Sequence, residues 1–243
     1  MATGTTTATR SPFEPTRYLT VEELADRPER HRRAWAVLTA VEVGAACAAI
    51  VLDLVVPSLV LLAMAVVSLV VRRAHWSSLG FHRPGARLVP QMLLFAVVWS
   101  LFQLAVAMPI ANHVSGEKQD LSDFEDLEGN VGMLLGMLAL GWIVGALVEE
   151  LAYRGYLQTR MRQLLGNGAA ALVVTVALSS VLFGRVHSEQ GLIGIVIVTL
   201  DGIAWSVLRY RYKTLWASVL AHGFNNTIGF MTFFFVGPVY GLW

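Results

Sequence analysis

Five polar side chains in the C-terminal half of the chain have the chemistry needed to activate water. Two are adjacent carboxylates, two are imidazoles and one is an amide, and all lie in otherwise apolar stretches: Glu149, Glu150, His187, His222 and Asn226. A carboxylate or an imidazole can take a proton from water, and hydrogen-bond donors can stabilise the anion that forms when water attacks a carbonyl. These residue types indicate hydrolysis, provided that the fold brings them together.

The spacing around the two glutamates assigns them different roles. Adjacent residues of an α-helix point about 100° apart, so Glu149 and Glu150 lie on different faces. Glu150 precedes Arg154 by four residues, which is the favourable order for an ion pair on one helix face. We therefore predict that Glu150 and Arg154 form a supporting pair, and that Glu149 is the general base. The alternative is that arginines neutralise both acids and the pairs only hold helices together.

His187 ends the segment Phe-Gly-Arg-Val-His, and its distance along the chain from Glu149 suggests a hairpin. The midpoint between the two residues is position 168, which lies in the turn-like sequence Gly166-Asn167-Gly168. Two antiparallel helices joined at that turn would bring Glu149 and His187 to the same level. A histidine by itself is more often structural, so this inference depends on the neighbouring acid.

His222 and Asn226 are four residues apart and therefore share one face of a helix. An imidazole and an amide can both donate hydrogen bonds toward one point. Such donors stabilise an oxyanion by about 3 to 4 kcal/mol for each well-placed group. We predict that this pair completes the catalytic set with Glu149 and His187.

The elements that must position these residues are membrane-spanning helices. The chain is 56% hydrophobic and only 14% charged, with a mean hydropathy of +0.60. Its apolar stretches of about 17 to 25 residues are long enough to cross a bilayer. We expect an all-α, polytopic transmembrane helical bundle of about seven spans, with the active-site helices in the C-terminal half. The expected spans are 34–56, 57–71, 88–111, 131–157, 168–187, 191–208 and 214–236.

Charge and composition divide the chain into four segments. Residues 1–33 form a polar N-terminal tail, in which a helix-like piece begins at Thr20 and Glu23 has capping-box spacing. Residues 34–130 hold the N-terminal transmembrane helices and loops, 131–236 hold the candidate site, and 237–243 are a C-terminal tail. No apolar region precedes a cleavage site in the tail, so a secretory signal peptide is not expected.

The loops alternate in charge in a way that predicts orientation. Arginines without an acid follow the second expected span, at positions 72, 73, 83 and 87, whereas the next loop is strongly acidic between 117 and 128. Basic loops face the cytoplasm. We therefore expect a multi-pass protein of the cell (plasma) membrane with its N-terminus in the cytoplasm.

Other charged residues in the apolar segments are expected to pair structurally. Glu42 and Asp53 lie in or near the first span, and Arg185 and Asp201 could pair between the fifth and sixth spans. A net charge of +1 gives no reason to expect nucleic-acid binding. The single cysteine, Cys47, excludes an intrachain disulfide. The chain also lacks H-E-x-x-H, G-x-S-G and G-x-G-D motifs, which excludes the usual zinc, serine and aspartate mechanisms.

Three motifs together resemble a known family. E-E-x-x-x-R, F-x-x-x-H and H-x-x-x-N occur in this order on three consecutive apolar regions. The chain is similar in this respect to the CPBP family, which groups CAAX prenyl endopeptidases with bacteriocin-processing and Abi-like immunity proteins, over roughly residues 131–236. The resemblance implies an intramembrane endopeptidase in which Glu149 and His187 position the nucleophilic water. It also implies that His222 and Asn226 are the oxyanion donors, and that Glu150 and Arg154 support them.

The resemblance leaves the cofactor and the substrate open. The family is called a metalloprotease family, and Glu149, His187 and His222 are candidate ligands for a divalent metal such as zinc. A glutamate-activated water could also act without a metal. The expected partners are the lipid bilayer and a membrane-associated peptide or protein, such as a prenylated CAAX peptide or a bacteriocin precursor.

Two other classes of function fit the same residues. The chain could be a noncatalytic bacteriocin-immunity or partner-binding membrane protein in which the polar cluster is a structural core. It could also be a proton-coupled transporter, because intramembrane acids and histidines build proton relays, although the sequence shows no inverted repeat.

Overall fold

The computed structural model describes residues 29–243, and within that range the regular structure is entirely helical. Seven helical stretches follow one another: α2 (Glu29–Val51), α3 (Pro57–Arg72), 88–115, 131–165, α8 (Ala169–Arg185), α9 (Gly191–Tyr212) and α10 (Leu215–Val236). Short 3-10 turns connect them: η1 (Trp76–Leu79), η3 (Ser122–Leu127) and η6 (Ser188–Gln190). The expected all-α class is confirmed. The proposed cap at Thr20 lies outside the described residues.

The helical stretches follow the predicted spans closely. Five of them are long and apolar enough to cross a membrane: Arg33–Val51, Leu88–Ser115, Val131–Leu165, Ser188–Tyr212 and Leu215–Val236. The other two, α3 and α8, are apolar but have only 16 and 17 residues. At 1.5 Å per residue they measure about 24 to 26 Å, which is shorter than a hydrocarbon layer of about 30 Å.

Two of the long stretches are not α-helical throughout. Residues 88–115 consist of α4 (Leu88–Phe102), the π-helical turn η2 (Gln103–Ala107) and α5 (Met108–Ser115). Residues 131–165 consist of α6 (Val131–Leu140), the π-helical segments η4 (Gly141–Val148) and η5 (Glu150–Leu157), and α7 (Gln158–Leu165). π-helical turns occur frequently at functional sites. Here Glu150 is the first residue of η5, and Glu149 lies at the junction between η4 and η5.

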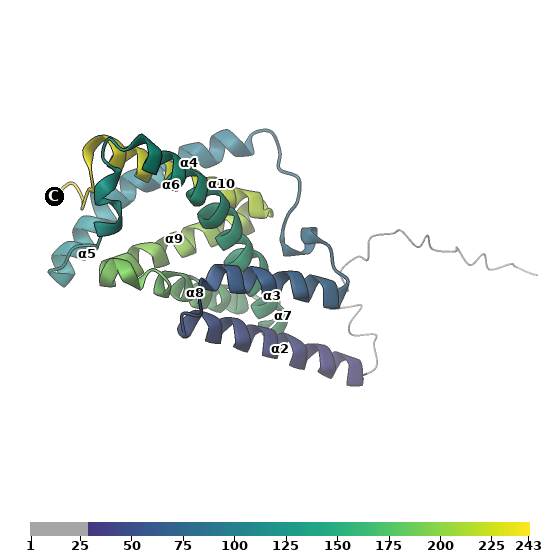
Figure 1. The fold of residues 1–243 in the computed structure, drawn as a ribbon. Helices are drawn as coiled ribbons and strands as arrows, with labels where there is room; N and C mark the ends of the chain where they lie inside the picture. Colours follow the sequence, from purple (N-terminus) through teal and green to yellow (C-terminus); the bar gives the residue numbers. More distant parts are fainter. Residues whose placement is uncertain (1–28) are drawn as a thin grey trace, which may run out of the picture.

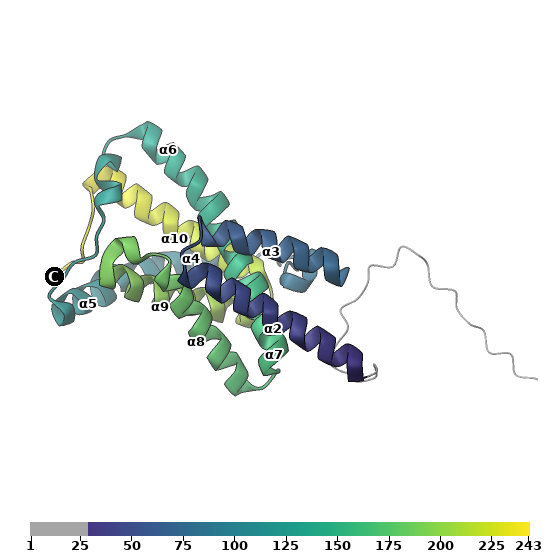
Figure 2. The same ribbon diagram turned by 60° about the horizontal axis from the view of Figure 1, so that its bottom comes forward.

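The helices form two groups around this central span. α2 and α3 lie side by side at one edge of the bundle (Figures 1 and 2), where α2 packs against α7 and α3 against η5. On the other side α10 packs along α4, α6 and η4, and α9 packs against both α8 and α10. The span 131–165 therefore contacts both groups.

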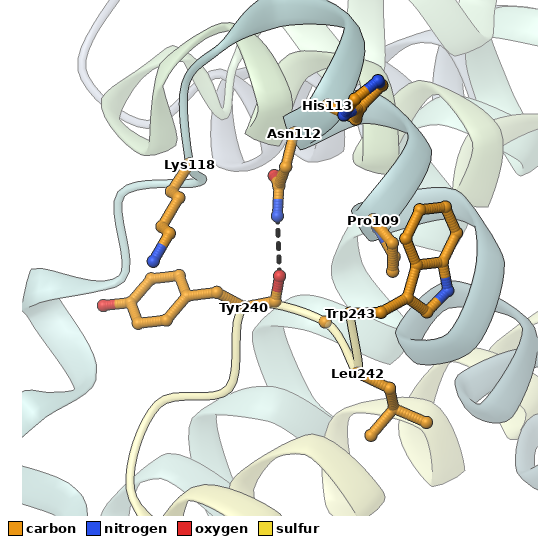
Figure 3. Close-up of a pocket in the computed structure, with 8 residues that line it drawn as sticks. Pro109, Asn112, His113, Lys118, Tyr240, Leu242 and Trp243 are labelled. Carbon is orange, nitrogen blue, oxygen red and sulfur yellow. Dashed lines mark hydrogen bonds between the residues drawn. The ribbon is translucent and has the colours of Figure 1, made fainter.

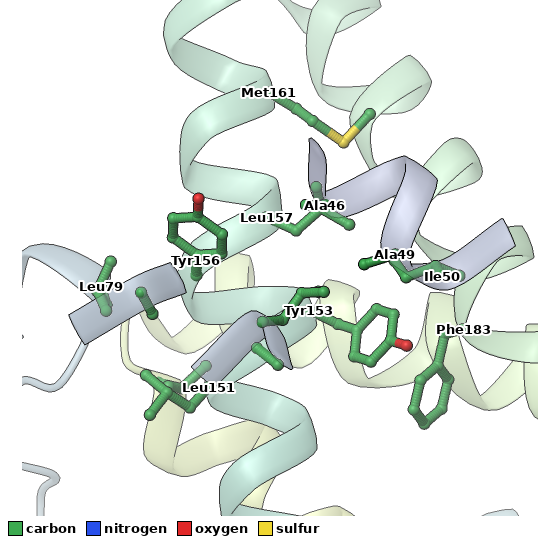
Figure 4. Close-up of a cluster of buried hydrophobic side chains, with 14 of the residues drawn as sticks. Ala46, Ala49, Ile50, Leu79, Leu151, Tyr153, Tyr156, Leu157, Met161 and Phe183 are labelled. Atoms are coloured by element: carbon green, nitrogen blue, oxygen red, sulfur yellow. The ribbon is translucent and has the colours of Figure 1, made fainter. Parts of the chain in front are cut away.

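A cluster of buried side chains joins the N-terminal helices to the central span. Tyr153, Tyr156 and Leu157 of η5 belong to one cluster with Ile50 of α2 and Phe183 of α8, and each is less than 2% exposed. Tyr153 lies beside Phe183, whereas Tyr156 lies on the other side of the cluster (Figure 4). The alanines of α2 in this cluster allow the helices to approach closely. This core fixes the orientation of η5, which begins at Glu150 and directly follows Glu149.

A polar contact reinforces the same junction. Glu42 of α2 accepts a hydrogen bond from Arg72 of α3 at 2.6 Å and forms an ion pair with Arg160 of α7 at 3.2 Å. Ser68 donates to the same carboxylate at 2.6 Å. The expected structural pairing of Glu42 is confirmed, and we call these four residues the Glu42 clamp.

The expected pair between Arg185 and Asp201 is wrong. Asp201 instead accepts hydrogen bonds from Trp99 Nε1 at 2.6 Å and Gln103 Nε2 at 2.9 Å, whereas Arg185 donates to Ser188 at 2.8 Å. Arg185 ends α8 next to the start of α9, and Asp201 lies ten residues into α9. That offset corresponds to about 15 Å along the helix axis, so the two charges cannot meet.

The C-terminal segment packs on the π-helical turn η2 and on α5. The Leu242 N–H donates to the Leu104 carbonyl at 3.1 Å, and Trp243 Nε1 donates to the Ala105 carbonyl at 2.9 Å. Asn112 Nδ2 donates to the Tyr240 carbonyl at 2.6 Å, across a pocket of about 430 Å³ that Lys118 also lines (Figure 3). These bonds hold residues 240–243 against the bundle.

Candidate active site

Glu150 lies at the centre of the buried polar cluster. Its Oε1 accepts a hydrogen bond from His222 Nδ1 at 3.0 Å and lies 3.1 Å from Arg154 Nη1. The side chains of Glu150 and Arg154 are fully buried, and that of His222 is 10% exposed. The predicted Glu150–Arg154 pair is therefore present. The contact with His222, 72 residues further along the chain, was not predicted.

The contact with Glu150 determines which nitrogen of His222 faces the site. An ionised carboxylate only accepts hydrogen bonds, so the Nδ1 of His222 must carry a proton. Its Nε2 then carries a lone pair and is an acceptor in the neutral imidazole, whereas it carries a proton and is a donor in the charged imidazole. Nε2 of His222 can therefore donate to an oxyanion only when the imidazole is charged.

His187 is held in a similar way by the backbone. It follows the last residues of α8, and its Nδ1 lies 3.0 Å from the Phe183 carbonyl oxygen, which can only accept. Nδ1 therefore carries the proton, and the Nε2 of the neutral ring is free to accept one. Gly184, in the same stretch, allows α8 to approach α9 closely, because a Cβ there would lie 2.5 Å from the Ile195 carbonyl oxygen of α9.

Glu149 is half-buried and occupies a different position from its neighbour. Its charge interacts with those of His187 and His222, and also with Glu150 and Arg154. Among the residues that the structure describes, none forms a hydrogen bond or an ion pair with the Glu149 carboxylate. Glu149 thus lies within electrostatic range of both histidines while its oxygens remain available to another molecule.

Asn226 of α10 faces the π-helical segment η4. Its Nδ2 donates to the Gly141 carbonyl at 3.1 Å, which uses one of its two amide hydrogens. A Cβ on Gly145 would lie only 2.9 Å from the same nitrogen. His222 and Asn226 therefore both point toward the span 131–165, as expected for residues four apart on one helix. A second amide hydrogen of Asn226 remains for a ligand.

Two aromatic side chains enclose the histidines, and the sequence assigned neither a role there. The Phe183 ring is 5.1 Å from the His187 ring and 6.1 Å from the His222 ring, and Arg154 lies 4.1 Å above it. Trp205 stacks on His222 at 5.7 Å with an interplanar angle of 14° and is fully buried. Phe183 begins the F-x-x-x-H motif, so the sequence could have indicated its place beside His187. Trp205 belongs to no motif, so nothing in the sequence indicated its contact with His222.

The donor chemistry of the two histidines suits a metal, since oxygen acceptors hold both Nδ1 atoms and leave Nε2 available. The three candidate ligands Glu149, His187 and His222 are nevertheless not gathered into a metal-binding set. Within residues 29–243, no three His, Cys, Asp or Glu side chains lie close enough to hold one ion. We therefore derive no step through a metal.

The fold and this site define an integral membrane protein with a buried glutamate–histidine cluster between its helices. Residues 131–228, from the start of α6 to the face of α10 that carries His222 and Asn226, match the family model described as Type II CAAX prenyl endopeptidase Rce1-like. The resemblance to CAAX-type proteases is confirmed over this segment, and it supports an enzyme. No curated protein and no solved structure matches the chain.

Proposed function

We propose that this protein is an intramembrane endopeptidase that hydrolyses a peptide bond of a membrane-associated or prenylated substrate. The observation that carries the proposal is the Glu149 carboxylate, which has no hydrogen-bond or ion-pair partner within residues 29–243 and lies within electrostatic range of two histidines, one of which is oriented by Glu150. The match of residues 131–228 to a CAAX endopeptidase family supports the same reaction class. A cell-membrane location with a cytoplasmic N-terminus belongs to this proposal.

The proposed reaction begins with water held between Glu149 and His187. Glu149 takes one proton, while His187 Nε2 accepts a hydrogen bond from the same water and aims its oxygen at the carbonyl carbon. A bond forms between that oxygen and the carbon, and the carbonyl electrons move to the carbonyl oxygen. Charged His222 and the second amide hydrogen of Asn226 donate to this oxyanion.

Collapse of the intermediate completes the hydrolysis. The oxyanion electrons re-form the carbonyl, protonated Glu149 delivers its proton to the departing nitrogen, and the carbon–nitrogen bond breaks to give a carboxylic acid and an amine. The acid proton, which is the second proton of the water, then passes to the amine, so the final products are a carboxylate and an ammonium group. Water supplies all the atoms gained, so the reaction needs no redox partner. Glu150 and Arg154 touch none of the reacting atoms and act by positioning His222.

The test is cleavage of quenched-fluorescent peptides by the purified protein in detergent. One peptide ends in a farnesylated CAAX sequence, and the other is identical but lacks the farnesyl group. We expect Glu149→Gln and His187→Ala each to lose about 100-fold or more in kcat/KM, because each removes a group from proton transfer. Glu189→Gln is the matched control, since this exposed acid lies two residues from His187.

Retained folding must accompany the loss, which thermal unfolding of each variant can show. Equal cleavage by the wild type, Glu149→Gln and His187→Ala would rule out the proposed mechanism. Cleavage of both peptides at the same rate would retain the endopeptidase and remove the prenyl requirement.

A further inference from the structure

A second pocket, separate from the candidate active site, lies where α4 and α10 begin. It has a volume of about 200 Å³ and is formed by the loop before α4, the first turn of α4 and the turn between α9 and α10. We call it the basic pocket, and its polar lining consists of His82, Arg83, Arg87, Gln91, Lys213 and Thr214. Its volume is below the range of about 300 to 1,000 Å³ typical of drug-sized ligands, so it suits a small group.

Hydrogen bonds between the loop and the helix turn build this pocket. The Leu215 N–H donates to the Gly80 carbonyl at 2.7 Å, and Thr214 Oγ1 donates to the His82 carbonyl at 2.8 Å. Gly80 has φ +100°, a conformation that favours glycine, and this allows the chain to reach the turn. The two walls are therefore fastened together rather than merely adjacent.

The lining carries positive charge. Arg83, Arg87 and Lys213 are exposed, and in the part of the chain that the structure describes no Asp or Glu lines the pocket. The first turn of α4 also has no acidic residue, so its partial positive charge adds to theirs. Three cations around one small volume indicate an anionic ligand.

Lys213 holds this position in an unfavourable backbone conformation. Its φ is +54° at the end of α9, a place where glycine is usual and a side chain adds strain. A lysine there puts a cation into the pocket at a cost in backbone energy. A Lys213→Gly substitution would remove the charge and relieve the backbone strain together, so it can test the role of the charge without destabilising the fold.

The surface beside the pocket indicates the rest of the ligand. An exposed apolar stripe follows α4 away from the pocket, with residues four apart: Val89, Leu93, Val97 and Leu101. Residues at this spacing share one helix face. An anionic group in the pocket would thus be continuous with a surface suited to an acyl chain.

We propose that the basic pocket binds the phosphate headgroup of an anionic phospholipid whose acyl chains lie along the stripe on α4. The pocket is at the arginine-rich end of the helices, where the cytoplasmic leaflet supplies anionic lipids. Inorganic phosphate shares the headgroup chemistry but has no acyl chain that could contact the stripe. This inference is independent of proteolysis.

Native mass spectrometry of the full chain in detergent can test the proposal with three probes: dioleoylphosphatidylglycerol, dioleoylphosphatidylcholine and inorganic phosphate. We expect phosphatidylglycerol to bind at least fivefold more tightly than phosphatidylcholine. Each cation near a membrane surface contributes about fivefold to such binding. Lys213→Gly should therefore lose about fivefold in affinity for phosphatidylglycerol, and Arg83→Gln/Arg87→Gln more.

Arg73→Gly is the matched control, because Arg73 is also a basic residue in the left-handed conformation at a helix end but does not line the pocket. It should leave lipid affinity unchanged. Lys213→Gly should unfold at the same temperature as the wild type or higher, which separates lost binding from lost structure. Equal losses from Lys213→Gly and Arg73→Gly would overturn the proposal. Inorganic phosphate that displaces the lipid at equal concentration would overturn the lipid assignment.

Discussion

At the scale of single residues, Glu150 joins structure to chemistry. One carboxylate oxygen contacts both Arg154 and His222, so the same charge neutralises a buried guanidinium and orients an imidazole. Glu149, one position earlier, has no such contacts. The difference between adjacent glutamates follows from the faces on which they lie.

We predict that Glu150→Gln destabilises the protein by about 3 to 5 kcal/mol, because it leaves Arg154 buried without its counter-charge. The double variant Glu150→Gln/Arg154→Leu should recover most of that stability, since both charges are gone. Cleavage should not recover, because His222 still lacks its carboxylate. Unfolding by SDS in mixed micelles measures the first quantity and a peptide assay the second. A double variant as unstable as the single one would show that the pair does not set stability.

The separation of Glu149, His187 and His222 bears on the cofactor. Because these side chains are not gathered as a metal-binding set, we predict that activity persists after treatment with a chelator and dialysis. Elemental analysis of the active protein should find less than one metal per chain. Loss of activity that zinc restores, with an unchanged unfolding temperature, would contradict the metal-free reaction.

Spacing alone could predict part of this site. The four-residue interval gave the Glu150–Arg154 pair, and the shared face of His222 and Asn226 is also present. The Glu150–His222 bond could not be predicted, since it depends on how α10 rotates against the central span. The expected Arg185–Asp201 pair is absent because opposite charges on two helices pair only if they lie at the same height in the bundle, and charge alone does not predict that height.

At the scale of elements, the contact between α10 and η4 depends on glycines. A Cβ on Gly223 of α10 would lie 2.5 Å from the Trp142 ring, and a Cβ on Gly141 would lie 2.6 Å from the Phe230 ring. Small residues allow membrane helices to approach closely. This approach is what brings Asn226 within reach of the Gly141 carbonyl.

We therefore predict that Gly223→Ala lowers the unfolding temperature and reduces cleavage at least tenfold, because α10 must move away from η4. Gly136→Ala is the control, since a Cβ at that exposed position of α6 meets nothing within 4 Å. It should be neutral or slightly stabilising. If both variants behave alike, close packing at Gly223 is not what positions His222.

The element boundaries were largely predictable and the type of helix was not. Apolar runs gave all seven helical stretches, including the turn at 166–168 that separates α7 from α8. The π-helical segments η4 and η5 could not be told from α-helix by their apolar runs, since the same kinds of residue form both: η4 is apolar throughout, and all eight residues of η5 are buried. They change the angle between adjacent side chains, so an α-helical wheel describes Glu149 and Glu150 only approximately.

At the scale of the whole molecule, the N-terminal helices are attached to the span that carries the candidate site. The Glu42 clamp joins α2 to α3 and to α7, beside the buried cluster around Tyr153 and Tyr156. The family match begins only at residue 131, so these helices lie outside it. Their contribution must therefore be tested directly.

We predict that Glu42→Gln loosens this attachment and lowers the unfolding temperature, because it leaves Arg72 and Arg160 without their shared counter-charge. Cleavage should fall much less than in Glu149→Gln, since the clamp touches none of the proposed catalytic residues. Glu117→Gln, in an exposed loop, removes the same charge elsewhere and should change neither quantity. A Glu42→Gln protein as stable as the wild type would show that apolar packing alone holds α2.

The Glu42 clamp also implies an order of assembly during synthesis. Glu42 leaves the ribosome 30 residues before Arg72, the last residue of α3, so α2 and α3 can enter the bilayer as a hairpin in which these two charges already neutralise each other. Arg160 arrives only when the span with both glutamates has been translated. Arg160 then forms its ion pair with Glu42 and joins the α2–α3 hairpin to α7. The first two helices are therefore attached to the central span only after the residues of the candidate site on that span have been made.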